Sequence, residues 1–208
     1  LSFQDLCYEL GDGTPILSDV TGKVEADKIT MLMGPSGSGK STLLSLLAGL
    51  SVPTAGGLQI LGDDIANMST RQRDRFRGAN LGVVFQQFNL IPYLSALDNV
   101  LLAARFGSAG MSGSRQRAAT LLERVNLPLA LHQRAASALS IGQQQRVAIA
   151  KALVQKPKIM LADEPIASLD PANATLVMDS LRQINKEDGL TVLVNLHTLD
   201  TARAYCDR

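Results

Sequence analysis

The sequence predicts an α/β fold with a mostly parallel sheet, on three observations. Short apolar runs typical of buried strands recur along the chain, and helical patterns lie between several of them. A phosphate-binding motif joins one of these runs to a helix. The 208 residues, 46% of them apolar, are enough to bury a substantial core. The expected strands are 1–8, 29–33, 58–61, 81–85, 159–162 and 191–194.

The phosphate-binding motif fits G-x-x-x-x-G-K-[ST]. Glycines let backbone N–H groups converge on a phosphate, and the helix pattern at 41–49 supplies a helix N-terminus that favours an anion. The lysine reaches the β- and γ-phosphates, and the last serine is placed to ligate Mg²⁺. The chain is therefore predicted to bind ATP or GTP. The expected nucleotide-binding residues are Gly34, Pro35, Ser36, Gly37, Ser38, Gly39, Lys40, Ser41 and Thr42.

One region breaks the alternation of strands and helices. Helical patterns follow one another at 99–105, 114–125 and 142–155 without a convincing strand between them. We therefore expect a helical subdomain, about 89–155, inserted into a nucleotide-binding core of 1–88 and 156–208. The glycine- and serine-rich stretch 107–113 is predicted to be a flexible link within it.

Two carboxylates follow the apolar run 159–162. Asp163 suits Mg²⁺, which prefers oxygen ligands and few protein contacts. Glu164 is then placed toward the γ-phosphate, where a base or water-positioning group is needed. Taken alone, the pair is more typical of an acidic turn after a strand. Beside the phosphate-binding motif, the catalytic interpretation is favoured.

The segment 138–146 indicates a second helix N-terminus. Ser140 is a natural N-cap, and Gly142 lies just inside the helix. Hydroxyl and backbone N–H groups at such an end form a second anion site. An ordinary capped helix is the alternative when this segment is considered by itself.

Composition excludes several classes of protein. No stretch approaches the roughly 18 apolar residues of a membrane-spanning helix, and no signal peptide is visible. A net charge of +1 gives no general attraction to nucleic acid, so we expect no nucleic-acid partner. The basic run 71–77 is predicted to be a solvated helix face rather than a nucleic-acid contact. Cys7 and Cys206 have no metal-ligand spacing, which favours a reduced, cytosolic chain.

Over essentially its whole length the chain resembles the nucleotide-binding subunit of an ATP-binding-cassette (ABC) transporter. Elements of that family recur here in family order. They are the phosphate loop 34–41, Gln86 of the glutamine loop, the signature 139–143, the acidic strand 159–164, the dimer-contact loop 168–170 and the switch histidine His197.

The resemblance implies a P-loop NTPase core with an antiparallel β part near the N-terminus and an inserted helical subdomain. It also implies that two cassettes, either copies of this chain or this chain and a paralogue, pack head to tail. The helix end at Ser140, Gly142 and Gln143 of one cassette would then face the γ-phosphate held by the other. Asp170 would contact the nucleotide site from the dimer-contact loop; with Pro171 it also makes local sense as an N-cap.

By the same resemblance, Gln86 would sense Mg²⁺ or the attacking water and couple the site to the membrane partner. Glu164 would be the general base, and His197 would orient the γ-phosphate. The implied cofactors are ATP and Mg²⁺. The implied partners are integral membrane permease subunits, which would hold the protein at the cytoplasmic face of the membrane.

Three positions depart from the family pattern. The signature carries Ile141 where a glycine is usual; we expect its side chain to pack into the helical region, with a place at the dimer seam as the alternative. Leu10 stands where an aromatic residue usually stacks on adenine, so Tyr8 is assigned that role, with a core tyrosine as the alternative. The chain stops at Arg208, where relatives continue, and we expect a truncated C-terminus.

Different segments of the chain resemble the ATPases of two different kinds of transporter. Residues 74–78, 84–92 and 96–100 are similar to ATPases that drive lipoprotein-releasing and macrolide-export permeases. Residues 162–171, 194–197 and 205–208 look more like ATPases of phosphonate importers. We expect the exporter-like class, with an importer as the alternative; a small-molecule phosphotransferase is a remoter one. The substrate is chosen by the membrane partners, so this subunit does not identify it.

Overall fold

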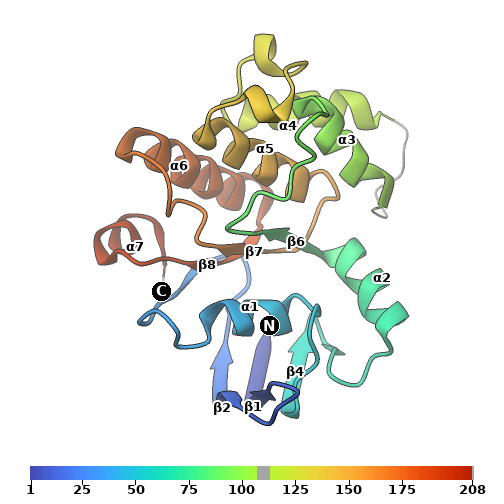
Figure 1. The fold of residues 1–208 in the computed structure, drawn as a ribbon, viewed down its shortest axis with the longest axis vertical. Coiled ribbons are helices and arrows are strands. Elements are labelled where there is room, and N and C mark those ends of the chain that lie inside the picture. The colour runs from blue at the N-terminus through green and yellow to red at the C-terminus, as the bar shows by residue number, and fades with distance from the viewer. Residues whose placement is uncertain (107–112, 208) are drawn as a thin grey trace.

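The structure is a computed structural model that describes residues 1–106 and 113–207. Three levels follow one another along its long axis (Figure 1). An antiparallel sheet lies at one end, a parallel sheet lies in the middle, and most of the helices lie at the other end. This arrangement confirms the predicted fold class, including the antiparallel part near the N-terminus.

The antiparallel sheet has the strand order β2-β1-β4-β5. The parallel sheet has the order β3-β8-β7-β6. The strands are β1 (Ser2–Glu9), β2 (Pro15–Lys23), β3 (Ile29–Leu32), β4 (Ala55–Ile60), β5 (Asp63–Asp64), β6 (Leu81–Val84), β7 (Ile159–Asp163) and β8 (Thr191–Asn195). The helices are α1 (Lys40–Leu47), α2 (Thr70–Asn80), α3 (Ala96–Phe106), α4 (Ser114–Arg124), α5 (Ile141–Leu153), α6 (Pro171–Asp188) and α7 (Leu199–Tyr205), with short 3-10 turns at Leu129–Leu131 and Ala136–Ala138.

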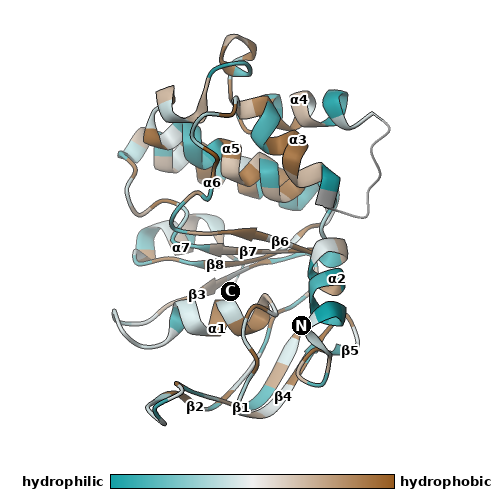
Figure 2. Ribbon diagram, turned by 45° about the vertical axis from the view of Figure 1, so that its right-hand side comes forward, coloured by the Kyte–Doolittle hydropathy of each residue, from teal (hydrophilic) through white to brown (hydrophobic). Residues whose placement is uncertain are grey.

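The parallel sheet has an apolar core on each side. The larger cluster joins it to α3, α4, α5 and α6, and the smaller one joins it to α1 and the antiparallel sheet. The strands β6 and β7 and the buried face of α1 are accordingly among the apolar parts of the ribbon in Figure 2. Burial on both faces explains why β7 and β8 are continuous apolar runs in the sequence rather than alternating ones.

The parallel register brings three strand ends together. Asn195 at the end of β8 pairs with Leu32 of β3 on one side and with Asp163 of β7 on the other. The carboxyl ends of parallel strands form one edge of the sheet, where ligands of α/β proteins bind. The loop from β3 into α1 starts at this same edge, so the topology places the phosphate-binding motif beside Asp163.

Most predicted elements are present, with a few differences. In the described part of residues 99–154 there is no strand, as expected. The predicted link 107–113 lies outside the described residues except for Gly113, which directly precedes α4. The strands β2 and β5 and the helix α7 were not predicted. No helix among the described residues is both long and apolar enough to cross a membrane.

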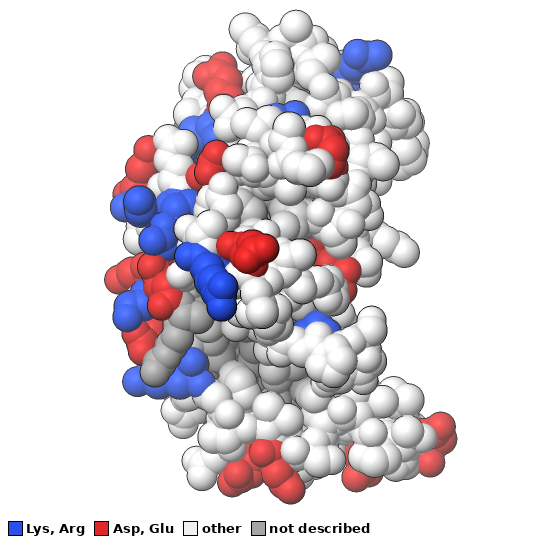
Figure 3. Space-filling model, turned by 90° about the vertical axis from the view of Figure 1, so that its left-hand side faces the viewer, with Lys and Arg blue, Asp and Glu red and all other residues white. Residues whose placement is uncertain are grey.

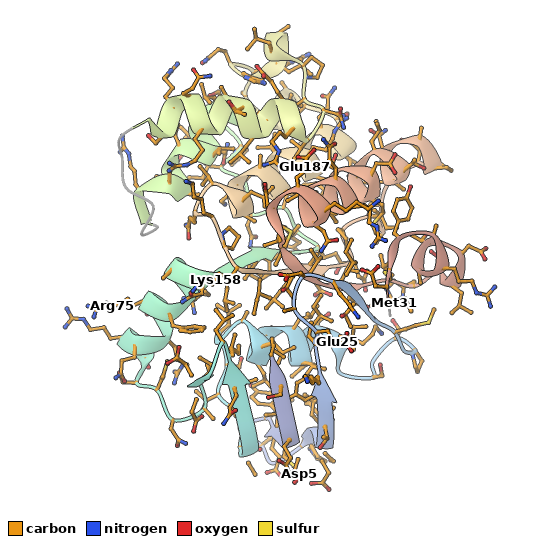
Figure 4. All side chains as sticks on the ribbon, turned by 180° about the vertical axis from the view of Figure 1, so that it is seen from behind. Asp5, Glu25, Met31, Arg75, Lys158 and Glu187 are labelled. Carbon is orange, nitrogen blue, oxygen red and sulfur yellow. The ribbon has the colours of Figure 1, made fainter. Side chains whose placement is uncertain are left out.

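The basic run 71–77 lies on α2, which has no buried side chain. Arg77 donates to Asp74 at 2.7 Å on the same helix, and Arg75 points away from the body of the molecule (Figure 4). The run therefore has the geometry of a solvated helix face.

Candidate functional site

The phosphate-binding motif forms the turn between β3 and α1. Gly37 and Gly39 have φ of 80° and 85°, a backbone region that favours glycine. A Cβ on Gly39 would lie 2.6 Å from Leu17 Cδ2 and 3.1 Å from the Ile16 carbonyl oxygen. The turn is thus shaped for glycine both by its dihedral angles and by the close approach of β2.

Lys40 is the first residue of α1, and only 8% of it is exposed. Its Nζ donates to the carbonyl oxygens of Gly34 at 2.8 Å and Pro35 at 2.7 Å. The ammonium group therefore lies across the mouth of the turn, against backbone atoms. This is where a lysine must lie to meet a phosphate that the turn encloses.

Ser41 and Asp163 line one narrow cavity, together with the apolar side chains Val84, Phe85 and Leu161. A hydroxyl and a carboxylate are oxygen donors, the type that Mg²⁺ prefers. Among the described residues no three His, Cys, Asp or Glu side chains group as a metal site. Mg²⁺ takes one or two protein oxygen ligands and completes its shell with phosphates and waters, so Ser41 and Asp163 are sufficient protein donors. The residues present therefore fit the ion.

Glu164 joins two of the other predicted catalytic residues. Its Oε1 is 2.6 Å from His197 Nε2, and its Oε2 accepts a hydrogen bond from Gln86 Nε2 at 3.1 Å. Glu164 has a φ of 49°, unusual for a residue other than glycine, and such strain is concentrated at functional sites. Its side chain is 18% exposed and that of His197 is 42% exposed, so the three groups are accessible from solvent.

These three residues come from separate parts of the chain. Gln86 lies in the loop after β6, Glu164 follows β7, and His197 follows β8. The neighbouring strands of the parallel sheet bring their carboxyl-end loops together. The catalytic roles themselves stay predictions.

Ser140 caps α5, as expected. Its hydroxyl accepts from Gln143 N at 3.3 Å, and Gln143 Oε1 accepts from Ser140 N at 2.9 Å, so both polar ends of a capping box are satisfied. No hydrogen bond of the described residues joins this helix end to the phosphate loop of the same chain. In the described part of the chain, the side chains of this helix end make their hydrogen bonds within the segment 139–144.

Ile141 differs from the expectation. It is an ordinary first residue of α5, outside the positive-φ region, so the family's glycine is not required by the backbone here. The expected burial in the helical region was wrong, because the residue is 51% exposed. Gly142 is the position where space is limiting: a Cβ there would lie 2.5 Å from Asn173 Oδ1.

Asp170 is the N-cap of α6, with Pro171 at the first helical position, as the sequence predicted. It accepts from Asn173 N at 3.0 Å and from Asn173 Nδ2 at 2.6 Å. These hydrogen bonds, above all the one from the Asn173 side chain, lower the pKa of the Asp170 carboxyl. Asn173 thus contacts both the dimer-contact loop and the signature helix end.

Tyr8 is half-buried and packs against the smaller apolar core. It pairs with Leu17, which is also the neighbour of Gly39, so Tyr8 lies one strand away from the phosphate loop. β1 is irregular between Leu6 and Glu9, and Leu10 lies beyond the strand end. The geometry is that of a partly exposed core tyrosine, and adenine stacking stays a prediction.

Two buried amides near this site were not predicted. Asn195 is 0% and Gln145 is 1% exposed. Asn195 Nδ2 donates to Asp163 Oδ1 at 2.8 Å, and Gln145 lines a small cavity with Gln86, Glu164 and Ser168. A signal for Asn195 did exist: it is the polar residue directly after the apolar run 191–194, at the edge where Asp163 was expected.

Comparison with known proteins agrees with this geometry. A family model described as "ABC transporter" matches residues 17–167. The "Phosphonates import ATP-binding protein PhnC" of Shigella flexneri is 49% identical over 197 residues, covering 89% of this chain and 75% of that protein. The protein of the same name from Rhizobium meliloti (strain 1021) is 44% identical over 213 residues, covering 99% and 75%.

Solved structures give the same result. The "post-hydrolysis state of the ATP-binding cassette MJ0796 bound to ADP and Pi", a dimeric structure, has a TM-score of 0.88 and 37% identity, covering 97% of this chain and 90% of that chain. The cbiO1 structure from Clostridium perfringens, "part of the ABC transporter complex cbiONQ", has a TM-score of 0.88 and 31% identity, covering 99% and 81%. The chain belongs to the ABC transporter family, as an ATP-binding domain whose ATP hydrolysis is coupled to transport.

Proposed function

We propose that this chain holds Mg²⁺–ATP through the turn 34–41 and Thr42, with Glu164 as the general base. Lys40 and the backbone N–H groups of the turn bind the β- and γ-phosphates, and Ser41, Asp163 and Gln86 supply the oxygen ligands or water contacts of the ion. When bound, the ion neutralises charge on the transferring phosphoryl group. Tyr8 is the candidate for contact with the adenine.

The observation that carries this assignment is the contact of Glu164 with Gln86 at 3.1 Å and with His197 at 2.6 Å. Each carboxylate oxygen has one partner and keeps a lone pair, because an oxygen of an ionised carboxylate accepts about two hydrogen bonds. Glu164 can therefore accept a proton from water while its orientation is fixed from both sides. His197, directly beside it, is placed to orient the γ-phosphate.

The helix end at Ser140, Gly142 and Gln143, together with Asp170, completes the site of a second cassette. The support is that the polar groups at this end of α5 do not contact the phosphate loop of their own chain, and that Ile141 is exposed beside them. On the face of the molecule drawn in Figure 3, charged side chains gather along one side and at the end with the antiparallel sheet, and the middle is mostly uncharged.

The permease is proposed to contact the groove between α2, the loop 85–89 and α5, beside Gln86. This groove of about 530 Å³ is lined by Phe85, Phe88 and Lys151, among others. Lys151 Nζ donates to the Asn89 carbonyl oxygen at 2.6 Å, and burial lowers the pKa of its ammonium group. The helices of 89–155 form the proposed subdomain on one side of this groove, and the chain is proposed to lie at the cytoplasmic face of the membrane through this contact.

The transport direction that we propose is import of a phosphonate-class substrate, the alternative of the sequence analysis. It rests on PhnC relatives of 44–50% identity. The exporter-like expectation is not confirmed by them.

The test is complementation of a bacterial strain that lacks its phosphonate-import ATPase. This chain should restore growth on methylphosphonate as the sole phosphorus source, and its Lys40→Ala variant should not. Growth restored by neither, although the chain is expressed and hydrolyses ATP, would refute the importer assignment and leave the ATPase assignment intact.

A further inference from the structure

Asn195 is completely buried at the carboxyl edge of the parallel sheet, between the end of β3 and Asp163. Its Nδ2 donates to Asp163 Oδ1 at 2.8 Å. The reverse orientation of the amide would place its oxygen against a carboxylate oxygen, so the assignment of nitrogen toward Asp163 is the one that chemistry favours. This hydrogen bond has an ionised acceptor and belongs to the stronger class.

The oxygen of the same amide has no comparable hydrogen bond in the part of the chain that the structure describes. Asn195 Oδ1 is buried and accepts no hydrogen bond from the described residues. A buried acceptor without a partner destabilises a fold, and an apolar side chain of the same shape avoids that penalty. Leucine matches asparagine in shape, and both neighbours of Asn195 in the chain, Val194 and Leu196, are buried and apolar. Folding explains the Nδ2 donor of this amide, through Asp163, but not its buried Oδ1, and in a leucine variant the lost hydrogen bond is offset by removal of that unpartnered acceptor.

We propose that Asn195 is a positioning residue for the metal site. Its Nδ2 occupies Oδ1 of Asp163 and so leaves the other carboxylate oxygen to face the ion, while its own Oδ1 is an acceptor for a water of the hydrated ion. This rests on the proposed Mg²⁺ site at Ser41 and Asp163. Side chains that orient metal ligands in this way typically change metal affinity by about 10- to 100-fold when removed.

A second buried asparagine provides a matched control. Asn185 lies at the end of α6 that is remote from its N-cap Asp170, and its Nδ2 donates to the carbonyl oxygens of Asp27 at 3.0 Å and Leu190 at 2.7 Å. Removing Asn185 leaves two carbonyl groups without this donor. A purely structural amide should therefore lower the melting temperature when replaced by leucine, with no effect on the metal.

The experiment compares Asn195→Leu and Asn185→Leu, each in the Glu164→Gln background that is designed to stop turnover. The melting temperature is measured without ligand, and then with saturating ATP across a Mg²⁺ titration. For Asn195→Leu we expect the ligand-free melting temperature to stay within about 2 °C of the parent and the Mg²⁺ midpoint to rise at least about tenfold. For Asn185→Leu we expect a lower melting temperature and an unchanged Mg²⁺ midpoint.

An unchanged Mg²⁺ midpoint in Asn195→Leu would overturn the proposal. So would a loss of ligand-free stability as large as that of Asn185→Leu, because Asn195 would then be a structural amide. If the parent itself shows no Mg²⁺-dependent stabilisation with ATP, the proposed metal site fails, and the role of Asn195 fails with it. The midpoint measured in the parent separates these two failures.

Discussion

Replacing Gly142 by alanine tests how closely the ends of α5 and α6 must approach. The added Cβ would lie 2.5 Å from Asn173 Oδ1 and 2.6 Å from its Cγ. An ordinary contact begins near 3.4 Å, so the Asn173 side chain would have to move by about 0.9 Å (3.4 minus 2.5). That side chain is held by Asp170 Oδ2 at 2.6 Å, so it cannot move without loosening the cap of α6.

Two effects of opposite sign set the magnitude for Gly142→Ala. Forcing an extra carbon into a packed site costs about 1–3 kcal/mol. Alanine is better than glycine within a helix by at most about 1 kcal/mol. The net fall in the free energy of unfolding lies between about 0 and 3 kcal/mol, and its middle, about 1–2 kcal/mol, would lower the melting temperature of a chain of this size by roughly 2–8 °C.

The assay is thermal unfolding without nucleotide, with Gly57→Ala as the matched control. Gly57 lies in β4, and a Cβ there would meet nothing within 4 Å. The control should be as stable as the parent, whereas Gly142→Ala should melt earlier. If both variants melt with the parent, α5 and α6 do not approach as closely as described, and the explanation for the glycine at this position is refuted.

Three further substitutions have defined outcomes. Lys40→Ala should lower the ATPase rate at least about 100-fold, because it removes the buried cation beside the phosphate turn; near-normal turnover would reject that role. Ile141→Gly should lower the free energy of unfolding by about 1 kcal/mol, half the value for a fully buried side chain, because the residue is 51% exposed. It should also raise the ATPase rate by removing bulk from the contact between cassettes. An unchanged rate would place Ile141 away from that contact. Asp170→Ala should lower the melting temperature at neutral pH. Hydrogen bonds from Asn173 lower the pKa of Asp170 from its ordinary 3.8. The carboxylate therefore stabilises the fold fully above pH 3.8, and this stabilisation is lost as the pH falls through the lowered pKa of the folded state. A difference in melting temperature between parent and Asp170→Ala that does not change down to about pH 2 would contradict this.

The parts of the fold that could be predicted have strong local signals. β7 and β8 are uninterrupted apolar runs because both faces of the sheet are covered, and α5 and α6 begin at Ser140 and at Asp170 with Pro171. β2 was missed because its alternation is broken by irregular pairing, with Asp19 at a φ of 53°. β5 has only two residues, too few for any pattern.

The site residues also divide into those with a local sequence signal and those that depend on the fold. The phosphate turn, Asp163 and Glu164 could be found from motifs that are local in the sequence, and Gln86 and His197 from a family pattern. Asn195 could be noticed as the polar residue after the apolar run 191–194, but its contact with Asp163 depends on the register between β7 and β8, which no local pattern contains. The exposure of Ile141 likewise depends on how α5 packs against its neighbours. The sequence identified the unusual residue but could not show whether its side chain is buried or exposed.

Glu164→Gln tests the central claim most directly, by following single-turnover hydrolysis of bound ATP together with the state of assembly. The amide keeps the shape, and its oxygen can still accept from Gln86 while its NH2 group donates to an unprotonated Nε2 of His197, but it cannot accept a proton. Hydrolysis should fall by about 100- to 10,000-fold, the usual contribution of a general base. ATP should still bind, and pairs of cassettes should accumulate when ATP is added, as seen by light scattering. Hydrolysis at the parent rate in this variant would show that Glu164 is not the base.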